Sequence, residues 1–135
     1  MLPRLLVLSC LTLTAACART LPDQDRRITV TPAIAKLPAE DLWKAYHDDK
    51  AAADKRYWGK AIEVSGKVTS VQGDTSTPRA IKFVVSGDAG IQAFLLDDEA
   101  ADVVKAAEVG RHFRLKCFCA GLETDVILRS CIQPR

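Results

Sequence analysis

The spacing of apolar residues changes period near Gly59. Before this residue, Leu42 and Tyr46 stand four positions apart, and Pro38 precedes two acidic residues, as is typical of a helix start. We therefore expect a helix from about Pro38 and a second helical stretch over 51–58 that ends at Gly59. After Gly59, apolar residues recur at every second position, which predicts β-strands with one buried face.

The second part of the chain contains five strand-like segments and one more helical stretch, over 99–107, between the third and the fourth of them. Gly66 lies in the middle of the first segment, where it permits a bend or bulge. A bent strand, a meander, a helix and a closing hairpin follow one another in this order in the OB-fold, a five-stranded Greek-key barrel. We expect a mainly β domain with helices, namely such a barrel preceded by an N-terminal helix. The expected strands are 62–70, 80–86, 91–96, 112–119 and 125–132.

Residues 1–17 combine one positive charge, an apolar run and small residues that lead to Cys17. The run is roughly half the ~20 residues of a spanning helix, which predicts a secretory signal peptide. Its end, from Leu13 to Cys17, resembles the lipobox of bacterial lipoproteins, in which the cysteine is acylated and becomes the N-terminus. The alternative is ordinary cleavage after Ala18. The first reading gives a membrane-anchored protein that faces the periplasm, and the second a soluble periplasmic or secreted one.

The residues after the signal peptide are polar up to about residue 37, and two prolines interrupt them. We expect a flexible tether over 18–37 and the helix plus OB-fold domain over 38–135. A length of 135 residues, with 48% hydrophobic and 27% charged residues, fits one globular domain. The 19 basic and 17 acidic residues give a net charge of +2, which is not the basic excess typical of nucleic-acid binders.

Two stretches of the domain resemble a specific family. The run Ala-Asp-Lys-Arg-Tyr-Trp-Gly-Lys at 53–60 leads into Ile-Glu-Val-Ser-Gly-Lys-Val at 62–68, and Cys-Ala-Gly at 119–121 precedes Val-Ile-Leu-Arg-Ser-Cys at 126–131. Over roughly 42–132 the chain resembles the tRNA-anti-like lipoproteins of bacteria, which join an N-terminal helix to an OB barrel. The resemblance implies the same fold and no assigned activity, because the family name reports a likeness to anticodon-binding barrels and does not demonstrate tRNA binding.

Three cysteines, Cys117, Cys119 and Cys131, remain in the domain, and an oxidising compartment favours a disulfide. The resemblance implies that Cys119 pairs with Cys131. A tight turn at 121–124 would instead bring Cys131 nearer to Cys117, so both pairings stay open. Together with His112, the three thiols form an alternative metal or redox site. We favour the disulfide with a spare thiol, and we expect neither a metal ion nor a cofactor.

The sequence contains no nucleophile elbow, no phosphate-binding glycine loop and no HExxH motif, so we do not expect an enzyme or any catalytic residue. We expect a non-catalytic envelope lipoprotein, anchored in the membrane through Cys17, that acts as a binding or interaction module for an envelope protein, peptide or glycan. Its expected ligand surface is the face of the second and third strands, where OB barrels usually bind. The loops 72–78 and 121–124 would rim this face.

Nucleic acid is the other class of ligand that OB barrels bind, through aromatic stacking on a basic groove. An exported location disfavours this partner, and the aromatic residues of the strands alternate in the apolar register and so fit the core. Basic residues that could nevertheless form a patch are scattered over the expected strands. They are Lys60, Lys67, Lys82, Arg114 and Lys116.

Overall fold

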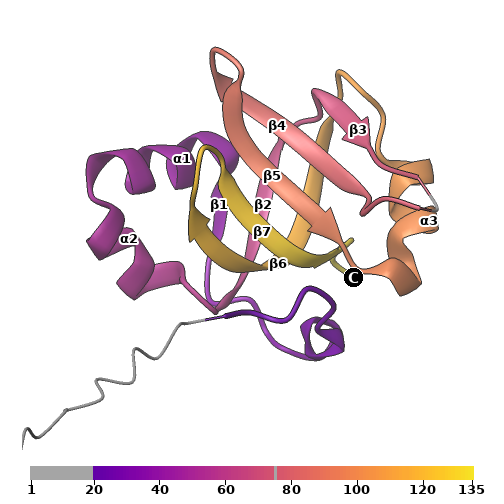
Figure 1. Cartoon of the computed structure of the whole chain (residues 1–135), viewed down its shortest axis with the longest axis horizontal. Helices are drawn as coiled ribbons and strands as arrows, with labels where there is room; N and C mark the ends of the chain where they lie inside the picture. The colour runs from indigo at the N-terminus through magenta and orange to yellow at the C-terminus, as the bar shows by residue number, and fades with distance from the viewer. Residues whose placement is uncertain (1–19, 75) are drawn as a thin grey trace, which may run out of the picture.

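The computed structural model describes residues 20–74 and 76–135, so the predicted signal peptide and Cys17 lie outside the described residues. A single sheet occupies the centre, with two helices packed at one side and a third at the other (Figure 1). No described helix has the length and hydrophobicity needed to cross a membrane. The elements are η1 (Arg26–Thr29), β1 (Lys36–Pro38), α1 (Ala39–Asp48), α2 (Lys50–Tyr57), β2 (Ala61–Lys67), β3 (Ser70–Gln72), β4 (Ala80–Ser86), β5 (Ala89–Leu95), α3 (Asp97–Ala106), β6 (His112–Leu122) and β7 (Val126–Ile132).

The seven strands lie in the order β1-β2-β6-β7-β5-β4-β3. β7 is parallel to β5 and antiparallel to β6, and β6 is antiparallel to β2. The mainly β architecture with helices is therefore confirmed, but the strand pairing gives a seven-stranded sheet in place of the expected five strands. Two local features account for the difference: β1 adds a parallel strand at one edge, and the expected first strand is divided into β2 and β3.

The division between β2 and β3 marks a change of hydrogen-bonding partner. The N–H of Val68 donates to the carbonyl of Arg111, just before β6, whereas the N–H of Thr69 donates to the carbonyl of Lys82 in β4. Consecutive residues thus bond to strands that are far apart in the sheet order. Gly66 precedes this change, and a Cβ there would lie 3.1 Å from the Ala39 side chain. The glycine therefore allows α1 to approach the sheet closely.

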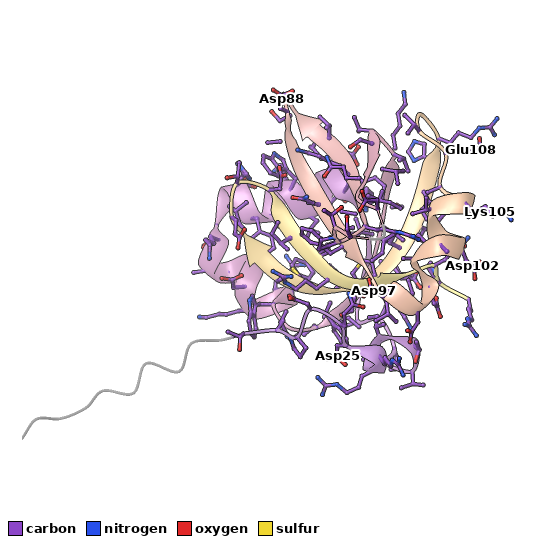
Figure 2. All side chains as sticks on the ribbon, turned by 45° about the vertical axis from the view of Figure 1, so that its right-hand side comes forward. Asp25, Asp88, Asp97, Asp102, Lys105 and Glu108 are labelled. Atoms are coloured by element: carbon purple, nitrogen blue, oxygen red, sulfur yellow. A yellow bond between two sulfur atoms is a disulfide. The ribbon has the colours of Figure 1, made fainter. Side chains whose placement is uncertain are left out.

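The main core lies between the inner face of the sheet and the helices. On α1 the buried residues Ala39, Leu42 and Tyr46 share one face, which explains why this helix packs with that side inward. α3 contributes Ala100 and Val103, while its Asp102 and Lys105 side chains point outward (Figure 2). Burial of one large apolar side chain contributes about 1.5–3 kcal/mol, so each helix is held by its apolar face.

The N-terminal segment differs from the flexible tether expected for residues 18–37. From Asp23 onward it is hydrogen-bonded to the sheet and runs along the bottom of the view in Figure 1. Ile28 of η1 is fully buried in a second apolar cluster on the outer face of the sheet. Of the apolar residues in this stretch, Ile28 is buried whereas Val30 and Ile34 are exposed, so their spacing in the sequence does not reveal this contact. The other members of the cluster are Ala61, Leu96, Phe118 and Ile132.

Candidate functional site

The face expected to bind a ligand is built from alternate residues of β4 and β5. Lys82 lies opposite Gln92 in the register, and Phe94 lies opposite Ala80. These three side chains point away from the core and are half-buried. The side-chain amide of Gln92 donates to that of Gln72 at 3.4 Å, which extends the polar row onto β3. The face is therefore a strip of hydrogen-bonding groups with one aromatic ring.

The basic residues of this face are matched by acidic ones. Lys82 pairs with the buried Asp125 at 3.2 Å, and the same carboxylate accepts the N–H of Gly90. Arg129 of β7 pairs with Asp23 at 2.6 Å and stacks its guanidinium over the Phe94 ring, 5.6 Å from the centroid. A surface with such balanced charges suits a neutral polar ligand better than a phosphate polymer.

One rim of the face is a turn ordered by Asp74. Its carboxylate accepts hydrogen bonds from the backbone and hydroxyl groups of Ser76 and Thr77. These bonds, led by that of the Ser76 hydroxyl, lower the pKa of Asp74 to about 2. The turn and α3 enclose a shallow hollow with Arg79 on its wall. The rim expected at 121–124 begins later in the structure, because β6 continues to Leu122.

A second surface, on the outer side of β2 and β6, carries unbalanced positive charge. Three cross-strand pairs line up there: Lys67 with His112, Ser65 with Arg114, and Glu63 with Lys116. Lys36 of β1 joins them beside Glu63. Among the described residues of these three pairs, Glu63 is acidic, whereas Lys67, Arg114 and Lys116 are basic. The strip therefore carries more positive than negative charge.

The Glu63 carboxylate lies between two basic groups without hydrogen-bonding either of them. Lys36 Nζ is 3.8 Å and Arg114 Nη1 is 3.9 Å from Oε2, an atom that is buried and lacks a hydrogen-bond partner among the described residues. Two adjoining hollows share Ser65 and Arg114 along this strip. The strip is thus a basic groove with one buried acceptor, which we call the β2–β6 groove.

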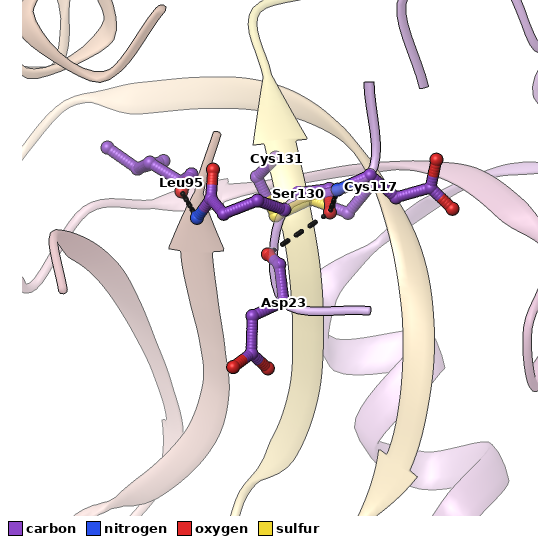
Figure 3. Close-up of a disulfide and its surroundings, with 7 residues drawn as sticks. Asp23, Leu95, Cys117, Ser130 and Cys131 are labelled. Atoms are coloured by element: carbon purple, nitrogen blue, oxygen red, sulfur yellow. Dashed lines mark hydrogen bonds between the residues drawn. A yellow bond between two sulfur atoms is a disulfide. The ribbon is translucent and has the colours of Figure 1, made fainter. Parts of the chain in front are cut away.

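The structure pairs Cys117 with Cys131 and leaves Cys119 as a buried thiol. The pairing of Cys119 with Cys131 that the family resemblance implied is thereby corrected. Register explains the outcome: Lys116 lies opposite Ile132, which sets Cys117 against Cys131, with the two Cα atoms 4.3 Å apart. The bond links β6 to β7 close to Ser130 (Figure 3).

The alternative thiol or metal site is not assembled. Two of its three thiols form the disulfide, and His112 lies at the opposite end of β6, beside Lys67. Within residues 20–74 and 76–135, no three His, Cys, Asp or Glu side chains are grouped to hold a metal ion. Cys119 instead contacts the hydroxyl of Tyr46 at 3.4 Å.

Tyr46 and Cys119, both buried, form a polar cluster with the partly exposed Asp54 that the sequence does not reveal. The hydroxyl of Tyr46 donates to Asp54 at 3.0 Å, so the thiol must donate to the phenol oxygen. Burial raises the pKa of Tyr46 and also that of Cys119. Both groups stay protonated at neutral pH, which fits a structural polar contact between the helices and the sheet.

Comparisons with known proteins give the family from one source and the fold from another. The profile of the tRNA_anti-like family matches residues 2–132. Among solved structures, the chain is similar to a proposed nucleic acid-binding lipoprotein from Klebsiella pneumoniae, with 12% sequence identity and a TM-score of 0.58. The similarity covers 82% of this chain and 98% of that one. A search of curated proteins found no match.

Proposed function

The chain belongs to the tRNA_anti-like family, and from this premise we propose that it is a non-catalytic lipoprotein of the bacterial envelope that uses an OB-type barrel as a binding module. Three observations support the anchor: the lipobox-like end at Cys17, the family, and the similar structure of a lipoprotein. In this proposal the acylated Cys17 holds the domain on a membrane, and the domain faces the periplasm.

We further infer that β2 and β3 are the two halves of one bent strand. The change of partner between Val68 and Thr69 supports this, because it connects the β6 side of the sheet to the β4 side through one continuous backbone. Counted in this way, β2 with β3, β4, β5, β6 and β7 are the five strands of an OB barrel. β1 is then an addition at its edge.

We base the proposal for the ligand on the face of β4 and β5, where basic and acidic groups are matched. Phe94 offers an aromatic surface under Arg129, and Gln72 and Gln92 offer amide donors and acceptors. Aromatic rings flanked by amides suit the C–H faces and hydroxyls of a glycan, or the backbone of a peptide. We therefore propose a neutral, polar envelope ligand of this kind for the face.

Intact mass measurement of the protein from its native envelope tests the anchor. We expect an N-terminal Cys17 that carries the mass of acyl chains. An unmodified N-terminus at Arg19 would contradict it.

Photo-cross-linking in cells tests the ligand face. A photoreactive residue at Gln92 is expected to give defined adducts, and the double variant Phe94→Ala, Arg129→Ala should abolish them. The matched control places the same residue at Lys105 on the outer side of α3, where few adducts are expected. Equal adducts at both positions would exclude the face as a specific site.

Nucleic acid is a second candidate ligand. The sequence disfavours it, but two observations support it. The similar Klebsiella structure is described as that of a proposed nucleic acid-binding lipoprotein, and the β2–β6 groove carries more positive than negative charge. A labelled single-stranded oligonucleotide should then bind more weakly as salt rises, and Lys67→Glu with Arg114→Glu should reduce the salt dependence by roughly 0.7 per lost phosphate contact. The same charge changes at Lys44 and Lys105 serve as the control. Binding without salt dependence would count against the groove.

A further inference from the structure

Near the start of the described residues, the chain is held against the sheet by hydrogen bonds and an ion pair. Asp23 pairs with Arg129, and its carbonyl accepts the Ser130 hydroxyl (Figure 3). The side chain of Gln24 donates to the Leu95 carbonyl at 3.2 Å and accepts the Asp97 N–H at 2.8 Å. From Asp23 onward, the chain is therefore bound to the domain and adds no length to the link between the domain and Cys17.

The reach from Cys17 to the domain is consequently short. Cys17 and Asp23 are six positions apart in the sequence, and a fully extended chain spans at most about 22 Å over that distance. Thr20 and Leu21 already line a hollow with Trp58 and Ala120. A lipid anchor at Cys17 would thus hold this end of the domain directly at the membrane surface.

The surface around this end combines exposed basic and aliphatic side chains. The last turn of α2 carries Lys55 and Arg56, and Lys60 follows, with its ammonium on the Lys55 carbonyl at 3.1 Å. The N–H of Ile34 bonds to the carbonyl of Ala61, next to Lys60.

Val30 and Ile34 are 80% and 59% exposed, and they are two of the three large hydrophobic residues that the described chain exposes in this way. Two acids near this end have basic partners. Asp54 pairs with Lys50, and Asp23 with Arg129. Glu123 also lines the hollow.

We propose that the surface formed by Val30, Ile34, Lys55, Arg56 and Lys60, the docking face, rests on an anionic lipid bilayer. Basic side chains attract anionic headgroups, and exposed aliphatic side chains insert at the boundary of headgroups and acyl chains. The inference rests on the proposed acylation of Cys17, and it fixes the orientation of the domain: the docking face lies toward the bilayer, while the β4–β5 turn and the last turn of α3, with Lys105, lie away from it.

Amine labelling of the acylated protein tests the orientation. The protein is reconstituted in vesicles of phosphatidylethanolamine with phosphatidylglycerol and treated with a membrane-impermeant acylating reagent. Relative to detergent micelles, we expect the labelling of Lys55 and Lys60 to fall roughly fivefold, the factor that one basic contact with an anionic surface supplies. Lys67 and Lys105 serve as internal references whose labelling should not change. Unchanged labelling of Lys55 and Lys60 would overturn the proposal.

The aliphatic contribution has a matched pair of variants. Val30→Asp with Ile34→Asp should restore the labelling of Lys55 and Lys60 in vesicles, whereas Val109→Asp, a similar change at an exposed site, should not. Equal effects of the two changes would contradict the docking face.

Mass measurement of the same sample reports the acylation of Cys17 separately, so a failed anchor and a failed docking face give different results. If Cys17 proves unmodified, co-sedimentation of the protein with the same vesicles still tests the face, and an absence of binding would exclude it.

Discussion

The hydroxyl of Ser130 accepts a 2.8 Å hydrogen bond from the backbone N–H of Asp25, a residue 105 positions earlier in the chain. Ser130 is fully buried and has a positive φ of 55°, which is uncommon for a residue other than glycine. Its hydroxyl also donates to the Asp23 carbonyl. One small side chain in β7 thus satisfies two backbone groups of the N-terminal segment.

Ser130→Ala should destabilise the protein by about 1–3 kcal/mol, because a buried N–H then loses its acceptor. Urea denaturation measures the loss, and hydrogen exchange at the Asp25 amide should accelerate. The control is Ser86→Ala at the exposed end of β4, which should change the free energy of unfolding by less than about 0.5 kcal/mol. Equal midpoints for the two variants would show that the contact contributes little.

Removal of the disulfide should cost about 3 kcal/mol, since the bond closes a loop over a sequence separation of 14. We expect dithiothreitol to destabilise the wild-type protein and Cys119→Ala, but not Cys117→Ala with Cys131→Ala. Denaturation with and without reductant measures this. A Cys117→Ala protein that remained sensitive to reductant would point instead to a bond between Cys119 and Cys131.

Stability should fall in alkaline solution because of Tyr46 and Cys119, whose pKa values burial raises above the ordinary 10.0 and 9.0. Below pH 9 the folded and unfolded chains both keep these protons, so the contribution is constant. Above pH 9 the unfolded chain releases protons that the folded chain retains, and unfolding becomes more favourable. Tyr46→Phe should make the decline with pH less steep, as urea midpoints between about pH 7 and 10.5 would record. An unchanged slope would exclude Tyr46 as its source.

Gly90→Ala should disrupt the β4–β5 pairing, because a Cβ there would overlap the carbonyl oxygen of Phe83. Overpacking of this kind costs about 1–3 kcal/mol or more. Gly87→Ala is the control: its Cβ meets no atom within 4 Å, and only its positive φ of 59° opposes alanine. Thermal unfolding should rank Gly90→Ala as the more harmful change, and the reverse order would argue against this close approach.

The pattern of apolar residues predicted β4, β5, β6 and β7, since β4, β5 and β7 each bury one face or both. It did not predict β1 or the division of the first expected strand into β2 and β3. The same pattern cannot show where a strand changes partners. Val68 and Thr69 continue the alternation of β2 without interruption, although their N–H groups bond to different parts of the sheet. Partner choice depends on residues far away in the sequence, and a single local period contains no information about them.

The disulfide shows that the sequence also could not predict the register between two paired strands. The sequence places the last turn at 121–124, whereas β6 extends to Leu122 and its pairing with β7 contains two shifts. Because the turn lies later, Leu122 pairs with Val126, and the same register places Cys117 opposite Cys131. The two shifts cancel between these pairs, and between them Cys119 lies against Leu128. The position of the turn depends on side-chain packing across both strands, so the residue count alone could not decide between the two pairings.

β7 has a central position in the sheet, between β5 and β6, and it is the last of the described strands to be synthesised. Every earlier strand therefore leaves the ribosome before the sheet can be completed. The parallel partner of β5 lies more than thirty positions downstream in the sequence, so β5 cannot pair with it until that segment has been synthesised. Non-local pairing of this kind slows folding, because loop closure must precede the contacts that stabilise it. A chain interrupted before β7 would lack the strand that joins the two halves of the sheet.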